Sequence, residues 1–230
     1  MGVITRVAGT IGTAGSGGDD GPATDAQLNY PYGVAVTADG GFLIADTVNP
    51  VVRKVSAGSV ITRIAGTIGT AGSGGDDGPA TDAQLNYPRA VAVTADGGFL
   101  IADTFNQVVR KVSAGGVITR VAGTPGTGGS GGDDGPATDA QLNYPFGVAV
   151  TADGGFLIAD TYNQVVRKVS AGGVITRVAG TPGTAGSGGD DGPATDAQLN
   201  HPYGVAVTAD GGFLIADTLN QVVRKVSAGG

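Results

Sequence analysis

Aspartate is the residue type whose number and spacing could support acid–base or metal chemistry in this chain of 230 residues. All 20 acidic residues are Asp, the single histidine is His201, and there is no Cys. These counts exclude thiolate chemistry and multi-histidine metal centres, and any Ser-His-Asp set would have to use His201. The GTAGSGG stretches lack the Lys of a phosphate-binding P-loop. Two recurring sets of carboxylates remain as candidates.

The first set consists of Asp-Asp pairs in glycine-rich loops: Asp19-Asp20, Asp76-Asp77, Asp133-Asp134 and Asp190-Asp191. Their carboxylates and the nearby carbonyls are the oxygen ligands that Ca²⁺ prefers. Their spacing, however, is not that of an EF-hand or of a nonapeptide calcium repeat. We therefore interpret these side chains as caps of their own turns, and we expect neither a metal nor a cofactor.

The second set is one carboxylate per repeat, each after an apolar run and before a Thr: Asp46, Asp103, Asp160 and Asp217. Acid–base catalysis needs two carboxylates with different environments. Four equivalent positions share one environment, so we expect no catalytic residue among them. We predict instead that each carboxylate accepts hydrogen bonds from the following turn or pairs with Arg53 and its equivalents.

The chain consists of four copies of a 57-residue unit. The phrase GVITRVAG begins at Gly2, recurs as SVITRIAG at Ser59, and returns at Gly116 and Gly173. The repeats therefore span residues 2–58, 59–115, 116–172 and 173–229. Most of the 57 positions are identical in all four copies, which indicates either recent amplification of a gene segment or design.

Four short β-type runs divide each unit, with turn residues between them. In the first unit they are expected at 33–37, 42–46, 51–55 and 60–64, and the tight hairpin ADGG joins the first two. A Gly-, Ser-, Thr- and Asp-rich segment follows, in which residues 79–85 are expected to form one helical turn anchored by a buried Leu85. The absence of Glu and the four Lys disfavour a helical bundle.

The polarity of the four runs predicts their order in a sheet. The first two are almost wholly apolar, as in strands covered on both faces, whereas the last two carry Arg53, Lys54 and Arg63 and are expected near solvent. A repeated four-stranded antiparallel sheet with buried inner strands is typical of a propeller blade. A β-solenoid is the alternative, but its coils are usually much shorter than 57 residues. We predict an all-β propeller with four blades per chain.

Charge and hydropathy exclude two classes of partner. The formal net charge is −7 and the isoelectric point is near 4.4, which argues against nucleic acid. No apolar run reaches the roughly 18 residues of a membrane span. The first residues also lack the basic and apolar regions of a signal peptide, and the composition leaves the compartment open.

The segment AQLNYPYGVAVTADGGFLIADTVNPVVRKV and its three copies resemble NHL repeats, whose core reads approximately P-x-G-V-A-V-D-x-x-G-x-x-Y-I-A-D-T-x-N-x-R-I-R-K. The similarity covers essentially the whole chain. Two polar positions differ, because Thr37 replaces an Asp and Val51 replaces an Arg. The resemblance implies a β-propeller, usually of six to eight blades, of a family that mostly binds proteins, RNA or glycans.

The strands are out of phase with the repeats, because Val3–Val7 has the sequence of a fourth strand and Val222–Val226 that of a third strand. Pairing the two would remove two exposed sheet edges. Such a clasp could close within one chain, giving a four-bladed monomer, or between two chains, giving an eight-bladed homodimer. We favour the homodimer as the expected assembly.

Variation among the repeats gathers at the connections on one end of the strands. The variable sets are Tyr32, Arg89, Phe146 and Tyr203; Val48, Phe105, Tyr162 and Leu219; Tyr30, Tyr87, Tyr144 and His201. Aromatic residues and Arg dominate binding hot spots, so these positions are the candidate face for a protein or glycan ligand. The alternative interpretation is neutral drift at tolerant loop positions or packing between blades.

Two classes of function follow from these features. The favoured one is a non-catalytic symmetric propeller that serves as a scaffold or as a binding module. The alternative is a propeller enzyme, a lyase or a glycan hydrolase. Known NHL-like lyases need several metal-ligating histidines, and this chain has one.

Overall fold

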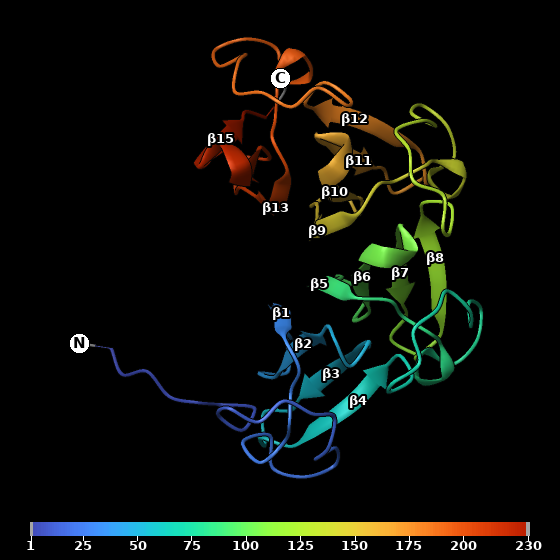
Figure 1. The fold of residues 1–230 in the computed structure, drawn as a ribbon, viewed down its shortest axis with the longest axis vertical. Helices are drawn as coiled ribbons and strands as arrows, with labels where there is room; N and C mark the ends of the chain where they lie inside the picture. The colour runs from blue at the N-terminus through green and yellow to red at the C-terminus, as the bar shows by residue number, and fades with distance from the viewer. Residues whose placement is uncertain (1, 229–230) are drawn as a thin grey trace.

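A computed structural model describes residues 2–228 and contains four blades arranged in an arc (Figure 1). Blade 1 contains β1 (Pro31–Val36), β2 (Phe42–Asp46), β3 (Val51–Val55) and β4 (Ile61–Ala65). Blade 2 contains β5 (Pro88–Val93), β6 (Phe99–Asp103), β7 (Val108–Val112) and β8 (Ile118–Ala122). Blade 3 contains β9 (Pro145–Val150), β10 (Phe156–Asp160), β11 (Val165–Val169) and β12 (Ile175–Ala179). Blade 4 contains β13 (Pro202–Val207), β14 (Phe213–Asp217) and β15 (Val222–Val226).

The strands of each blade are antiparallel and follow chain order from the centre of the arc outward (Figure 1). The predicted all-β propeller fold is therefore confirmed. The second and third strands of the first repeat have the expected bounds, whereas the first begins two residues before residue 33 and the fourth begins one residue after residue 60. The expected hairpin is present, with the amide of Thr37 donating to the carbonyl of Gly41.

Short 3₁₀ turns are the helical elements of the described chain, and none is long or apolar enough to cross a membrane. One kind lies in the long loop: η1 (Ala80–Asp82), η3 (Ala137–Asp139) and η5 (Ala194–Asp196). The other joins the second and third strands: η2 (Thr104–Asn106), η4 (Thr161–Asn163) and η6 (Thr218–Asn220). The turn expected within residues 79–85 is thus present, and Leu85 is completely buried.

The core lies between adjacent blades. Leu43 and Val52 from blade 1 pack with Leu85, Val91 and Phe99 of the next repeat, and the same kind of cluster recurs at the following boundaries. Burial of apolar side chains at each boundary stabilises the contact by about 25 cal/mol per Å². Each blade therefore depends on its neighbour for part of its core.

The arc does not close on itself. Contacts join β1 to β5, β5 to β9 and β9 to β13, but no comparable contact joins β13 back to β1. Residues 3–7, expected to form a strand, have no strand structure and lie extended away from the blades, and Ile4 is 98% exposed (Figure 1). Residues 3–7 do not reach β15 in this structure, so neither clasp is formed in it, and the choice between closure within one chain and closure between two chains stays a prediction.

Candidate ligand-binding face

The predicted aromatic positions do lie at one end of the blades, where they form two rows. The inner row crosses all four blades. The Arg89 guanidinium carbon lies 4.8 Å from the centroid of the Tyr32 ring and 4.1 Å from that of Phe146. The ring of Phe146 in turn stacks on Tyr203, with centroids 4.5 Å apart. Cation–π and stacking contacts therefore join the four equivalent residues.

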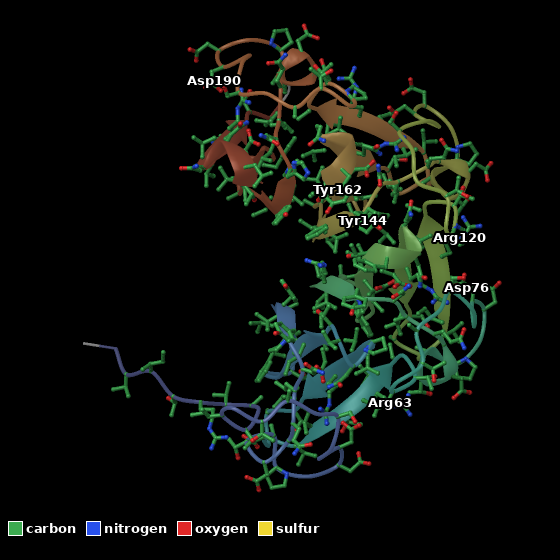
Figure 2. All side chains as sticks on the ribbon, in the orientation of Figure 1. Arg63, Asp76, Arg120, Tyr144, Tyr162 and Asp190 are labelled. Carbon is green, nitrogen blue, oxygen red and sulfur yellow. The ribbon has the colours of Figure 1, made fainter. Side chains whose placement is uncertain are left out.

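The outer row alternates between two of the variable sets. Tyr87 stacks on Phe105 at 4.4 Å, and Phe105 meets the edge of Tyr144 at 5.2 Å. The row continues from Tyr144 to Tyr162 at 4.6 Å and from Tyr162 to His201 at 5.1 Å. Figure 2 shows Tyr144 and Tyr162 together on the inner side of the arc. The remaining positions at this end, Tyr30, Val48 and Leu219, are exposed.

A strained backbone holds the outer row in place. Tyr30, Tyr87, Tyr144 and His201 all adopt left-handed conformations with φ of 51° or 52°. Non-glycine residues in this region cost of order 1–3 kcal/mol each and often mark functional sites. No signal in the sequence marks these residues as left-handed.

Arg89 differs from the other cationic residues because its guanidinium has no hydrogen-bond partner among the described residues, and its Nε atom is buried. Every other Arg and Lys among residues 2–228 donates at least one hydrogen bond. Arg89 therefore has unused donors at the centre of the inner row.

A cavity of about 540 Å³ adjoins the inner row, and each of the four innermost strands supplies three of its lining residues. Arg89, Phe146 and Tyr203 line it together with small residues such as Gly147 and Gly204. The cavity is concave and is bordered by aromatic side chains with one unpaired cation, a combination that is typical of a small-ligand site.

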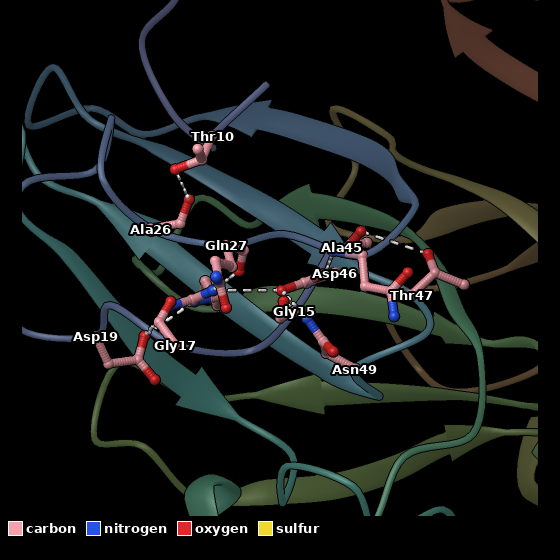
Figure 3. Close-up of polar contacts among 12 residues, drawn as sticks. Thr10, Gly15, Gly17, Asp19, Ala26, Gln27, Ala45, Asp46, Thr47 and Asn49 are labelled. Atoms are coloured by element: carbon pink, nitrogen blue, oxygen red, sulfur yellow. Dashed lines mark hydrogen bonds and ion pairs between the residues drawn. The ribbon is translucent and has the colours of Figure 1, made fainter. Parts of the chain in front are cut away.

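A buried polar network lies beneath this face (Figure 3). In blade 1, Asp46 accepts hydrogen bonds from the amide of Asn29 at 2.7 Å and from the Asn49 side chain at 2.9 Å. Its carboxylate also lies 3.4 Å from the Arg53 guanidinium. Both predicted roles of this Asp set, turn acceptor and Arg partner, are confirmed. Asn29 immediately precedes Tyr30, and Asn86, Asn143 and Asn200, which make the equivalent bonds, precede Tyr87, Tyr144 and His201, so the network also fixes the backbone that presents these residues of the outer row.

Arg53 is buried rather than near solvent, so that expectation was wrong. Only 1% of its side chain is exposed. It donates to the carbonyls of Gln27 and Gly17 and lies 2.7 Å from the Asp19 carboxylate. These partners lie in a loop of the same repeat that folds back over the strand, which strand alternation alone does not reveal.

The first Asp of each Asp-Asp pair joins this network rather than capping its own turn. Asp19, Asp76, Asp133 and Asp190 each pair at 2.6–2.8 Å with the equivalent Arg of their blade, which is buried in blades 1 to 3 and 11% exposed in blade 4. Figure 2 shows Asp76 and Asp190 on peripheral loops, far from Tyr144 and Tyr162. Among residues 2–228 no three candidate ligands are grouped so as to hold a metal ion.

Burial controls the protonation of the carboxylates in the network. Desolvation raises the pKa of Asp103 and of Asp160 to about 7, and raises that of Asp46 above its ordinary value, despite their hydrogen bonds and Arg partners. Exposed carboxylates behave in the opposite way. Hydrogen bonds from Lys54 and Thr37 lower the pKa of Asp39 well below its usual range.

We expect the protein to be more stable at pH 5 than at pH 8. Asp103 and Asp160 bind protons more tightly in the folded state, where their pKa is about 7, than in the unfolded state, where an aspartate has its ordinary pKa of 3.8. Stability must therefore fall as pH rises through that window. The measurement is the melting temperature at the two pH values. Asp103→Asn, which cannot titrate at that position, should show a smaller difference, and an equal difference would contradict the assignment.

Comparison with known sequences finds partial relatives, while no protein-family model matches the chain. Teneurin-4 of Mus musculus is 30% identical over 231 residues, which cover 91% of this chain and 8% of the relative. Protein SUPPRESSOR OF QUENCHING 1, chloroplastic, of Arabidopsis thaliana is 35% identical over 94 residues, which cover 41% of this chain and 9% of the relative. The chain thus spans less than a tenth of these relatives.

Several solved structures share the fold. A streptogramin B lyase superposes with a TM-score of 0.61 at 12% identity, covering 90% of this chain and 54% of the other. An auxiliary nutrient binding protein of Bacteroides ovatus superposes with a TM-score of 0.64 at 18% identity, covering 88% of this chain and 49% of the other. A gluconolactonase of Xanthomonas campestris superposes with a TM-score of 0.62 at 16% identity, covering 89% of this chain and 60% of the other. At these identities the similarity shows the fold alone.

Proposed function

We propose that this chain is an NHL-type propeller array that binds a ligand on its aromatic face without transforming it. The observation that carries the proposal is the inner row, in which Arg89 is held between two rings and keeps unused hydrogen-bond donors. A pure scaffold has no need of an unpaired cation there. The strained residues of the outer row add support, because such strain persists where the surrounding structure enforces it.

The ligand class follows from the chemistry of the face. A free guanidinium binds carboxylates with two parallel hydrogen bonds. Tyrosine rings offer an apolar surface with a polar hydroxyl at the edge, which complements the C–H faces and hydroxyls of a sugar ring. With a net charge of −7, the protein repels polyanions. We therefore propose an oligosaccharide that carries a single carboxylate.

The burial of the Asp46 set favours a binding role over a catalytic one for these four carboxylates. Asp46 and its equivalents Asp103, Asp160 and Asp217 are completely buried and hydrogen-bonded to Asn side chains. A general acid or base must reach a bound substrate within hydrogen-bond distance. His201, the one imidazole, lies within hydrogen-bond distance of the Asn200 side chain at the edge of the face.

Titration calorimetry with an oligosaccharide ending in glucuronic acid, and with its neutral glucose counterpart, tests this proposal. The protein should bind the acidic sugar and discriminate against the neutral one. Arg89→Gln should weaken binding of the acidic sugar by about 10- to 100-fold, as expected for loss of a charge-assisted hydrogen bond.

Lys111→Gln is the matched control, because it removes the same charge from an exposed pair with Asp96 outside the face. Its affinity should be unchanged. Absence of binding to both sugars, or an Arg89→Gln variant that binds like the original chain, would overturn the proposal. Preferential binding of an acidic peptide in a parallel titration would exclude the glycan assignment.

A further inference from the structure

Equivalent residues in the two end blades and the interior blades differ sharply in exposure. In blade 4, Val223 is 70% exposed, whereas its equivalents are completely buried: Val52, Val109 and Val166. At the other end of the arc, Val34 of β1 is 69% exposed, whereas Val91 and Val148 are 6% and 7% exposed. The residue types are the same, so the difference reflects only whether a neighbouring element covers them.

A groove of about 740 Å³ marks what blade 4 lacks. It lies between β15 and the loop of residues 189–194. In blade 1 the corresponding space holds β4, which pairs with β3 on one side and with the loop on the other. The Ile61 carbonyl accepts a hydrogen bond from Asp20 at 2.7 Å, and the Ile61 amide donates to Gly21 at 3.1 Å. Blade 4 presents the same edge and the same loop with no strand of the described chain between them.

Residues 3–8 carry the sequence that fits this groove. They read VITRVA, identical to residues 117–122 and 174–179, which contain the fourth strands of blades 2 and 3. In those strands the central Ile is completely buried, whereas Ile4 is 98% exposed. The described chain thus has a segment with a fourth-strand sequence that pairs with no blade, and a groove beside β15 that no strand fills.

We propose that residues 3–8 of one copy occupy the groove of a second copy, and that the reciprocal exchange closes two four-bladed arcs into an eight-bladed ring. The antiparallel register follows from the β11–β12 pairs, when each residue is replaced by the equivalent residue of β15 or of residues 3–8. The pairs it gives between copies are Ile4 with Val226, Thr5 with Lys225, Arg6 with Arg224, and Ala8 with Val223. The two clasps are equivalent and related by a two-fold axis.

The contact between blades inside the chain supports the same partner. The hydroxyl of Thr47 donates across the boundary to the carbonyl of Pro88 at 2.6 Å, and Thr104 and Thr161 make the equivalent bonds at 2.7 Å. Thr218 is exposed and bonds only within its own blade. In the proposed dimer, the carbonyl of Pro31 from the second copy is the acceptor for Thr218. The boundary between copies then has the same contact as the three boundaries within each chain.

The second copy is favoured over closure within one chain by the shape of the arc. Residues 2–8 lead away from blade 1 rather than across to β15 (Figure 1). The inner strands β1 and β13 do not pack together, so self-closure would require repacking all three boundaries. Reciprocal exchange between two arcs instead keeps the three boundaries of each chain and adds contacts only at the ends of the arcs.

Light scattering of the 230-residue chain at micromolar concentration tests the assembly. The expected mass is twice the 22.3 kDa of one chain. Ile4→Asp should reduce it to that of one chain, because the equivalent positions are completely buried. Val3→Asp is the matched control and should preserve the dimer, since its equivalents Val60, Val117 and Val174 are 42–43% exposed. Both residues are exposed in the single chain, so neither change should unfold it.

Cross-linking tests the register. The chain has no Cys. The Cα atoms of directly opposed residues in antiparallel strands are about 4.5–5.5 Å apart, which is within the Cα–Cα range of a disulfide. Thr5→Cys combined with Lys225→Cys should yield a covalent dimer on a non-reducing gel. A single-chain mass for the original protein, a disulfide formed within one chain, or open-ended assemblies larger than a dimer would each overturn the proposal.

Discussion

Replacing Arg167 with methionine is expected to destabilise the protein by about 3–5 kcal/mol, the usual cost of removing one partner of a buried ion pair. Its side chain is 1% exposed and lies 3.5 Å from the completely buried Asp160 carboxylate. It also donates to the carbonyls of Gln141 and Gly131. Methionine fills a similar volume but removes the donors to both carbonyls and leaves the Asp160 carboxylate with its Asn143 and Asn163 donors and without a cationic partner. Urea denaturation monitored by circular dichroism measures the loss.

The adjacent residue supplies the control. Lys168 is 34% exposed and pairs with Asp153, which is 55% exposed. Surface pairs of this kind contribute about 0–1 kcal/mol, so Lys168→Met should leave the free energy of unfolding nearly unchanged. The two substitutions remove the same charge from neighbouring positions of one strand. Equal losses of stability would show that the network beneath the aromatic face does not hold the blade together.

Replacing Gly123 with alanine is expected to cost roughly 3 kcal/mol or more. Gly123 follows β8 with φ of +88°, and a Cβ there would lie 2.4 Å from the Gln107 carbonyl oxygen and 2.9 Å from the Val108 Cα. The left-handed backbone alone costs an L-residue about 1–2 kcal/mol, and overpacking against fixed backbone adds about 1–3 kcal/mol. The melting temperature and the urea midpoint should both fall.

Gly126 separates the two contributions. It also has a left-handed backbone, with φ of +69°, but a Cβ there meets nothing within 4 Å. Gly126→Ala should therefore show only the backbone cost. If both variants lose the same stability, the close approach between the end of β8 and the start of β7 is not a packing constraint.

The repeat period and the strand runs were sufficient to predict the fold. The run FLIAD is apolar up to its final Asp46 because the strand is buried within the blade, and its predicted bounds match β2. The aromatic face was predicted from differences among otherwise identical repeats. The structure brings these side chains into contact with one another, and their role as a ligand face stays a prediction.

The features that sequence reasoning missed depend on contacts between distant segments. Arg53 was expected near solvent because its strand alternates polar and apolar residues, yet a loop more than thirty residues away covers it. The left-handed conformation of Tyr30 is enforced by hydrogen bonds to residues after β2. The open arc depends on the curvature that accumulates over three blade boundaries, which no single repeat encodes.

The fourth strand of a blade comes from the next sequence repeat, and this has a consequence for the evolution of such proteins. In blades 1 to 3 the outer strand belongs to the following sequence repeat, so the boundaries of the sequence repeats and of the blades differ by one strand. Duplication or loss of a whole 57-residue segment leaves the same free strand and the same vacant edge on the product. Under the proposed strand exchange, the number of copies that meet sets the size of the ring, so a change in the number of repeats requires no new interface.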